Sequence, residues 1–533
     1  MEQKIDLLSG SRFHKEANKV YKVPVDELPK RKMFNSKNQQ IAEEIDFENE
    51  TVIKMIVEFI QHHETYQVPR LKQLERYYQA ENNIKYRNKK AEGRADNRIA
   101  SDFAKFIVKF KQGILLGNPL KYTGDKAITK KVDEFSKSSN EDYHNQLMAR
   151  DMFTFGRAYE WIGRDEYGKE TLSKFDVQET FVIYDASKNK NSVCAVNYYD
   201  VEFLDKTTMH VDVYACDGFV YKFKTERLSE DMGSPVAEQS YFDAVQVNEW
   251  INNEERTGDF ESVLDSIDAY DLSRSEMANF QQDSSEAYLV IQGNPDTGED
   301  DAGDNSESNV LQDMIKARML VLGDKKIYED GQAGTDPKAY YLKKEYDTQG
   351  VESNDSRTVA DILRFTSLID FTDENIGSNQ SGIGFRFKGW GSDNDRKNKE
   401  RMIKKAIMRR LRLLTYSWNL KDDLKKTNSA ISTIKNLFKS EAKQQEQLYE
   451  KVNDIEILFT PNVPQSDEEI MSVISGMDGI VSEQTLFEMT SRLTGVSADE
   501  EIKRIKKEFE NKLEPSQHDV DKSTETEEVV IDE

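Results

Sequence analysis

The residues that could do chemistry gather in one stretch, residues 371–412. Glycine, asparagine and serine dominate its first half, which predicts a loop. Within that loop, apolar residues alternate with Arg386 and Lys388, as in a short strand. From residue 391 to 412, nine Lys or Arg stand against three Asp or Glu, so the local balance is 9 − 3 = +6 in a chain of net charge −25. The stretch therefore differs in charge from the rest of the protein.

The basic run from Arg396 to Arg412 has two interpretations. Apolar residues recur along it as in any amphipathic helix: Met402, Ile403, Ile407, Leu411 and Leu414. The cations would then form a solvated face on which Glu400 pairs with a neighbour. Alternatively, some of these cations contact an anionic partner. The pattern alone leaves both interpretations open.

Catalytic signatures are absent from the sequence. It has no G-x-x-x-x-G-K-[ST] phosphate loop, no H-E-x-x-H and no G-x-S-x-G. The pair Gly382 and Gly384 is half of a dinucleotide fingerprint and lacks the third glycine. We expect the adjacent histidines 62–63, at a helix end, to be a surface pair. Cys194 and Cys216 lack the spacing of a zinc site, so we expect buried strand cysteines.

Acidic residues raise two further possibilities. Glu299, Asp300, Asp301 and Asp304 lack the register of a calcium loop, so a solvated loop is the better interpretation. A nuclease that uses paired acids and Mg²⁺ would need carboxylates grouped on a rigid strand end. The acids here fall mostly in predicted loops and on helix faces. We therefore expect no catalytic residue, no metal and no cofactor.

Length, apolar runs, cysteine count and net charge limit which classes of protein this chain could belong to. With 533 residues, the chain is long enough for three or four domains. No apolar run approaches the ~20 residues of a membrane span, and the N-terminus does not resemble a signal peptide. Two cysteines in so long a chain indicate a reducing compartment. The acidic balance argues against general coating of nucleic acid, which needs a basic surface.

Hydrophobic periodicity predicts an α+β fold with an antiparallel sheet. We expect residues 1–40 to be poorly ordered or peripheral, residues 81–97 to be a polar, basic connection, and the acidic tail from 514 to be disordered. Predicted helices cover 41–63, a stretch from 69, 97–116, 142–155, 260–282, 354–370, the basic run to 418, 429–450 and three stretches after 464. On helix 260–282 we expect the acids to face away from the apolar side. Predicted strands cover 158–164, 181–184, 193–200, 209–215, 219–223, 288–292 and 454–459, and residues 314–342 predict a small βαβ-like or α+β insert.

Three segments together resemble one protein family. They are DFTDENIGSNQSGIGFRFKGWG followed by NKERMIKKAIMRRLRLL, NRIASDFAKFIVKFKQGILLGNP at 97–119, and IEILFTPNVPQSDEEIMSVISGMDGIVSEQTLFEM at 455–489. They look like the most characteristic stretches of portal proteins from tailed phages of Gram-positive bacteria, and they come in that family's order. The resemblance covers most of the chain from about residue 40 to 510.

The resemblance implies a mainly helical portal fold with an antiparallel wing sheet, a two-helix stem, a small α/β clip and a helical crown. By residues it implies a peripheral arm (1–40), the wing (41–255), stem helices (256–285 and 349–370) around the clip (286–348), the tunnel-loop region (371–392), a long helix returning to the wing (393–460), the crown (461–512) and the acidic tail (513–533). The tunnel-lining candidates are Asn379, Ser381, Arg386, Lys388, Lys397 and Arg401. The partner-binding candidates in the clip are Glu299, Asp300, Asp301, Lys325 and Lys326.

The resemblance also implies a function without catalysis. A portal is a ring, usually a dodecamer, at one capsid vertex, through which double-stranded DNA enters and leaves. It docks the terminase large subunit, later a head-completion or adaptor protein, and it contacts major capsid and scaffold proteins. The expected location is the virion, and the host cytoplasm during assembly. Competing interpretations are another ring component of the virion, such as an adaptor or scaffold, and the nuclease considered above.

Overall fold

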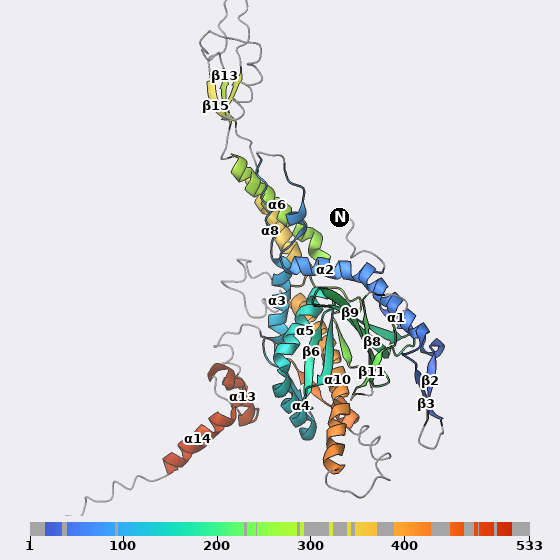
Figure 1. Cartoon of the computed structure of the whole chain (residues 1–533). Coiled ribbons are helices and arrows are strands. Elements are labelled where there is room, and N and C mark those ends of the chain that lie inside the picture. Colours follow the sequence, from blue (N-terminus) through green and yellow to red (C-terminus); the bar gives the residue numbers. More distant parts are fainter. Residues whose placement is uncertain are drawn as a thin grey trace, which may run out of the picture. The chain divides into compact units, whose positions relative to one another are not determined.

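A computed structural model describes most of the chain (Figure 1). The described residues are 16–34, 40–90, 94–226, 228, 232–240, 242, 244–284, 288–292, 319–322, 338–342, 347–369, 389–427, 448–462, 474–477, 479–494 and 498–513. The chain divides into two units, residues 1–461 and 462–533, and each is considered by itself. The predictions for 1–15, most of 429–450 and the acidic tail lie outside the described residues.

A six-stranded sheet forms one half of the first unit. Its order is β1 (Tyr21–Val23), β7 (Thr180–Asp185), β8 (Ser192–Phe203), β9 (Lys206–Ala215), β10 (Phe219–Thr225) and β11 (Val236–Gln239). All neighbours pair antiparallel except β1 with β7. The strands predicted at 181–223 are confirmed because alternating side chains there fill a core on each face. Helix α1 (Glu50–His62) packs its apolar side on one of these faces.

A second, three-stranded sheet has the order β12 (Val247–Ile251), β5 (Arg157–Arg164) and β6 (Glu170–Phe175). It shares the larger hydrophobic core with surrounding helices. These are α2 (Val68–Tyr78), α3 (Phe103–Leu116), α4 (Lys126–Ser139), α5 (Glu141–Phe155) and the long α10 (Trp390–Thr427). The small antiparallel pair β4 (Lys121–Thr123) and β16 (Glu456–Leu458) joins the end of this unit to the segment between α3 and α4.

The structure corrects several element predictions. Residues expected in the helix from 41 instead form β3 (Gln40–Ile45), which pairs with β2 (Lys30–Phe34). Helix α1 begins only after Asn49, whose side chain accepts the Thr51 N–H, so this cap fixes the helix start. Residues 16–34, which we expected to be poorly ordered or peripheral, place β1 on the edge of the six-stranded sheet with Tyr21 and Val23 buried. Helix α4 and strands β6 and β12 were not predicted.

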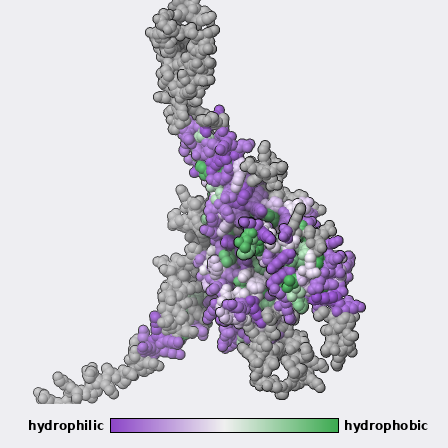
Figure 2. Space-filling view, in the orientation of Figure 1, coloured by the Kyte–Doolittle hydropathy of each residue, from purple (hydrophilic) through white to green (hydrophobic). Residues whose placement is uncertain are grey.

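Two helices that pack side by side are separated in the sequence by a small three-stranded sheet. The 3₁₀ turn Glu261–Val263 leads into α6 (Leu264–Ser284), and α8 (Thr348–Phe365) packs beside α6. The small sheet has the order β14 (Met319–Leu322), β13 (Tyr288–Gln292) and β15 (Lys338–Leu342), with β13 parallel to β14 and antiparallel to β15. Over α6 and α8 the described surface is largely hydrophilic in the view of Figure 2.

The acids of α6, which we expected opposite its apolar side, contact other parts of the chain. Asp268 accepts hydrogen bonds from Tyr77 and Asn83, and Glu276 binds Arg87 and Lys90. The 3₁₀ turn Asn83–Tyr86 and the connection that follows it therefore lie against α6. In Figure 1 this connection runs beside α6. The basic composition of residues 81–97 is explained by the acids that it meets.

The second unit is helical where it is described. Residues 474–477 form a short helical turn, followed by α13 (Glu483–Thr494) and α14 (Ala498–Leu513). The two longer helices contact each other. Among the helices that the structure describes in either unit, none is both long enough and apolar enough to cross a membrane.

Candidate functional site at the helix junction

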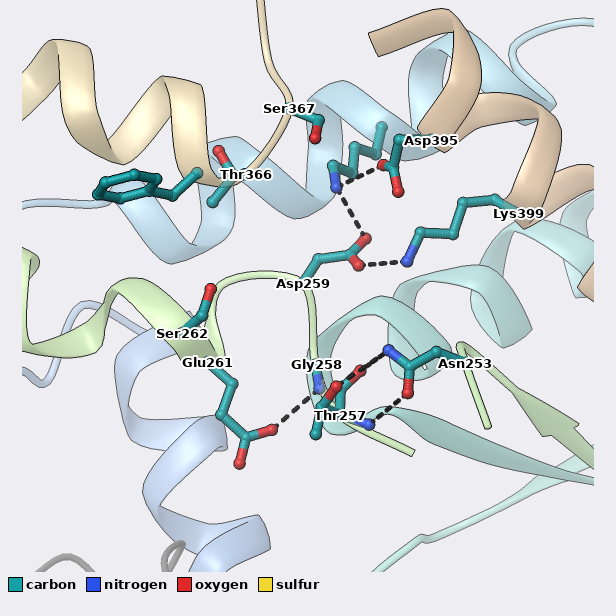
Figure 3. Close-up of a pocket in the computed structure, with 12 residues that line it drawn as sticks. Asn253, Thr257, Gly258, Asp259, Glu261, Ser262, Thr366, Ser367, Asp395 and Lys399 are labelled. Atoms are coloured by element: carbon teal, nitrogen blue, oxygen red, sulfur yellow. Dashed lines mark hydrogen bonds and ion pairs between the residues drawn. The ribbon is translucent and has the colours of Figure 1, made fainter. Parts of the chain in front are cut away.

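A cavity lies where three helices and the loop before α6 meet (Figure 3). It encloses about 410 Å³ between α3, the loop before α6, the end of α8 and the start of α10. Its lining residues are Lys111, Asn253, Thr257, Gly258, Asp259, Glu261, Ser262, Phe365, Thr366, Ser367, Asp395 and Lys399. The described chain stops at residue 369 and resumes at 389, so both flanks of the glycine-rich stretch reach this junction.

A buried charge cluster holds the junction together. Lys399 donates to Asn252 Oδ1 at 2.5 Å and to the Asp259 carboxylate. Lys111 Nζ lies 2.8 Å from Asp395 Oδ2 and 3.5 Å from Asp259 Oδ2. Burial alone would raise the pKa of Asp259, but the two ammonium groups outweigh it and lower that pKa. Two cations therefore face two carboxylates, which leaves no positive surplus for an anionic ligand.

Helix α8 stops sharply at this cavity. Leu368 N–H donates to Leu363 O at 2.8 Å and Ser367 N–H to Arg364 O at 3.1 Å, which together form a Schellman motif. Ser367 takes the left-handed position of this motif with φ +59°, where glycine is usual. Leu368 and Ser392 also line a second, small cavity beside Lys111 and Lys399. The two flanks of the glycine-rich stretch are therefore fixed to the same place.

The loop before α6 is seated tightly against the turn between α5 and β5. Gly156 has φ +83°, and a Cβ added there would collide with the backbone of Arg256. A Cβ on Gly258 would collide with the carbonyl of Thr154. Arg256 itself has φ +56°, and its guanidinium binds the buried Glu249. The sheet core and α6 are thus joined by close backbone contact as well as by charge.

The candidate tunnel-lining residues are only partly described. Lys397 forms an ion pair with Asp393 at 2.7 Å, and Arg401 donates to Asn398 at 2.9 Å on the exposed side of α10. Asn379, Ser381, Arg386 and Lys388 lie outside the described residues. The clip candidates Glu299, Asp300, Asp301, Lys325 and Lys326 also lie outside them. Of the candidate tunnel-lining and clip residues, the structure therefore describes only Lys397 and Arg401.

The basic run also hides a cluster that we did not predict. Arg410 is fully buried and donates to Glu160, Glu141 and Asn145. Burial alone would raise the pKa of Glu160, but Arg410 and His144 lower it well below its ordinary value. A solvated helix face, one of our two interpretations, is therefore wrong for Arg410 and for the buried Lys399, although it holds for Arg401.

The sequence did contain a signal for this burial. Arg410 follows Ile403 and Ile407 and precedes Leu414 at helical spacings of four, three and four residues. It therefore stands on the apolar side of α10. A charged residue on such a stripe has to find a buried partner.

The adjacent histidines have structural partners, and the cysteines are free. His63 is fully buried and binds Tyr198 Oη at 2.7 Å, and His62 lies against Tyr21 and Glu16, so our prediction of a surface pair is wrong. Cys194 is buried in β8, as predicted, and burial raises its thiol pKa, whereas Cys216 lies in the turn after β9 and is only partly buried, so the prediction is wrong for it. Within the described part of the chain, no group of three or more His, Cys, Asp or Glu is placed to hold a metal ion.

Comparison with known proteins identifies a family. A family model described as "Phage portal protein, SPP1 Gp6-like" matches residues 57–514. A chain from a solved "Virion of native gene transfer agent (GTA) particle" is 9% identical, with a TM-score of 0.34 over 74% of this chain and 89% of that one. A chain from a "Neck of empty GTA particle computed with C6 symmetry" is 8% identical, with a TM-score of 0.35 over 74% and 90%. No curated protein matches this chain.

Proposed function

The chain belongs to the SPP1 Gp6-like phage portal protein family, and from this premise we propose that it forms the DNA conduit at one capsid vertex. Twelve copies close into a ring in which double-stranded DNA is packaged, retained and later released. The observation that carries the proposal is the family match, which extends over residues 57–514 and so includes β5 to β12, the α6–α8 pair and α10.

The proposed parts follow the chain in order. The wing comprises residues 41–255, and the N-terminal arm, residues 1–40, adds β1 to the edge of its six-stranded sheet. The stem consists of 256–285 and 349–370, and the clip of 286–348 joins them. The tunnel-loop region is 371–392, the long helix and its return to the wing are 393–460, the crown is 461–512 and the acidic tail is 513–533. The charge cluster of Asp259 and Lys399 supports this division, because it ties the start of α6 to the start of α10.

The net negative charge of the protein would let DNA move through the ring instead of binding tightly to its wall. Duplex DNA carries one negative charge per ~1.7 Å of its axis, so a continuously basic channel would hold it by many contacts. A protein of net charge −25 with a few cations near the path would let it slide. We assign phosphate contact to Arg386 and Lys388, with Asn379, Ser381, Lys397 and Arg401 beside the same path.

This assignment is tested by reversing charge. Arg386→Glu with Lys388→Glu should reduce DNA packaging or retention in assembled heads. The matched control is Lys126→Glu with Lys130→Glu, which makes the same charge change on α4. If the loop pair behaves like wild type, or if the control pair is equally impaired, the two residues are not the phosphate contacts.

Partners complete the proposed function. The clip residues Glu299, Asp300, Asp301, Lys325 and Lys326 would dock the terminase large subunit and then a head-completion or adaptor protein. The wing and crown would contact major capsid and scaffold proteins. Assembly would take place in the host cytoplasm, before the ring becomes part of the virion. Pull-down of the terminase large subunit by wild type but not by a variant with alanine at these five residues tests the docking site.

The central test is direct imaging. Negative-stain micrographs of the purified full chain should show rings with a central hole. The same preparation should show neither ATP turnover nor cleavage of DNA, because the motor is supplied by a partner. A chain that stays monomeric at micromolar concentration, or that hydrolyses ATP or DNA by itself, contradicts the proposal.

A further inference from the structure

An extended segment, residues 94–101, lies along α6, and we call it the strap. Every second backbone N–H of the strap donates to a side chain of α6. The four hydrogen bonds are Ser101 to Asp271 Oδ1 at 2.8 Å, Ile99 to Ser275 Oγ at 2.9 Å, Asn97 to Asn279 Oδ1 at 2.6 Å, and Ala95 to Asp283 Oδ1 at 3.1 Å. From one hydrogen bond to the next, the strap residue number falls by two and the α6 residue number rises by four.

This register follows from the geometry of the two elements. Two residues of extended chain advance by about 6.6 Å. Four residues of α-helix advance by about 6.0 Å, and residues four apart lie on one side of the helix. An extended chain can therefore place alternate N–H groups opposite a stripe of polar side chains at positions i, i+4, i+8 and i+12. Asp271, Ser275, Asn279 and Asp283 are such a stripe.

The contact is polar although it is covered. Asp271, Ser275 and Asn279 are 1%, 0% and 2% exposed. The large apolar side chain of the strap, Ile99, remains 45% exposed and so adds little hydrophobic burial. Burial raises the pKa of Asp271, whereas the Ser101 N–H and Asn82 lower it. The strap is thus held by hydrogen bonds rather than by apolar packing, from its main chain and also from the side chain of Asn97, which donates to Asn279 and Gln282.

We propose that the polar stripe of α6 is a binding site for extended polypeptide main chain, and that the strap is a clasp that can leave it while the hydrophobic core stays packed. When the strap lifts, each of the four hydrogen bonds to α6 is replaced by a hydrogen bond to water. Opening also exposes little apolar surface, because Ile99 is already 45% exposed. Local openings of this kind lie below global unfolding in free energy. An open clasp would leave the polar stripe of α6 accessible while Tyr77 still binds Asp268, and the use of that opening in a conduit rests on the proposed function.

Hydrogen exchange on the full chain, read by mass spectrometry, tests the clasp. In wild type, the strap amides should exchange at least tenfold faster than those of α5. Ser275→Ala removes the acceptor of the Ile99 N–H and should speed strap exchange by about tenfold, with α5 unchanged. The matched control Ser273→Ala makes the same change on α6 outside the stripe. Ile99→Ala keeps the main chain and should change strap exchange by less than about twofold.

Two outcomes would overturn the inference. One is strap exchange that is unaltered by Ser275→Ala and by the double variant with Asn279→Ala. The other is wild-type strap exchange as slow as that of α5, which would make the strap a fixed part of the core. Neither outcome depends on ring formation. A chain that forms no rings would contradict the conduit but would leave this result standing.

Discussion

The buried Arg410 allows a sharp test of how α10 is held. Its side chain is fully buried, and its guanidinium makes four hydrogen bonds: Nε to Glu160 Oε1 at 2.8 Å, Nη1 to Glu141 Oε1 at 2.6 Å, and Nη2 to Asn145 Oδ1 at 2.8 Å and Glu160 Oε1 at 2.5 Å. Arg410→Met keeps much of the volume and removes the charge. Glu160, which is also fully buried, would then keep only the partners His144, Asn248 and Trp250.

The expected loss follows from those uncompensated charges. Removing one partner of a buried ion pair costs about 3–5 kcal/mol. Equilibrium urea unfolding of the full chain, followed by tryptophan fluorescence, should show a loss in this range. The double variant Arg410→Met with Glu160→Gln should lose less than the sum of the two single variants, because it no longer buries the Glu160 charge without its cation.

The matched control is Arg401→Met on the same helix. Arg401 is exposed and its one described hydrogen bond is with Asn398, so this change should cost less than about 0.5 kcal/mol. A cost below about 1 kcal/mol for Arg410→Met, or strict additivity in the double variant, would refute the argument that this cluster fixes α10.

Three further predictions concern single residues. His63 is buried beside Tyr198 and its pKa is lowered to about 3, mainly by burial, from 6.5. Between pH 7 and pH 5 the unfolded chain therefore binds a proton at His63 that the folded chain does not bind. This difference should lower the free energy of unfolding by about 2 kcal/mol between pH 7 and pH 5. Urea unfolding of His63→Gln at both pH values should lack this component. Gly156→Ala should cost more than about 2 kcal/mol, because it strains a positive φ and collides with the backbone of Arg256, and a melting temperature equal to that of wild type would contradict this. Ser367→Gly should raise the free energy of unfolding by about 0.5–1 kcal/mol by relieving the left-handed serine at the end of α8, and a loss in urea unfolding would show that the serine side chain contributes more than its strain costs.

Periodicity predicted the local elements well where one pattern dominated. Strands β7 to β10 were found because their side chains alternate over two cores. The helix prediction for residues 41–45 was wrong because Ile41 and Ile45 are four residues apart, a spacing that fits a strand as well as a helix. Only the N-cap at Asn49 shows that the helix begins later. Helix α4 carries Ile128, Val132 and Phe135 at helical spacing, but lysines interrupt this short pattern.

The helix junction was harder to predict because its contacts join distant residues. Lys399 and Asp259 are 140 residues apart, and Arg410 and Glu160 are 250 apart. No local spacing reports such pairs. The excess of positive charge did mark α10 as unusual, but charge alone could not separate cations that face solvent from cations that hold the helix in place. Only the position of Arg410 on the apolar stripe carried that information.

The common anchorage of Leu368 and Ser392 has a consequence for how this protein can vary. The entropy of closing a loop grows only with the logarithm of its length, about 0.6 kcal/mol for each doubling. Residues added to or removed from 370–388 would therefore change the thermodynamic balance of the fold very little, provided that the two anchor points are kept. Natural selection could therefore lengthen, shorten or rewrite that stretch while the surrounding architecture stays the same.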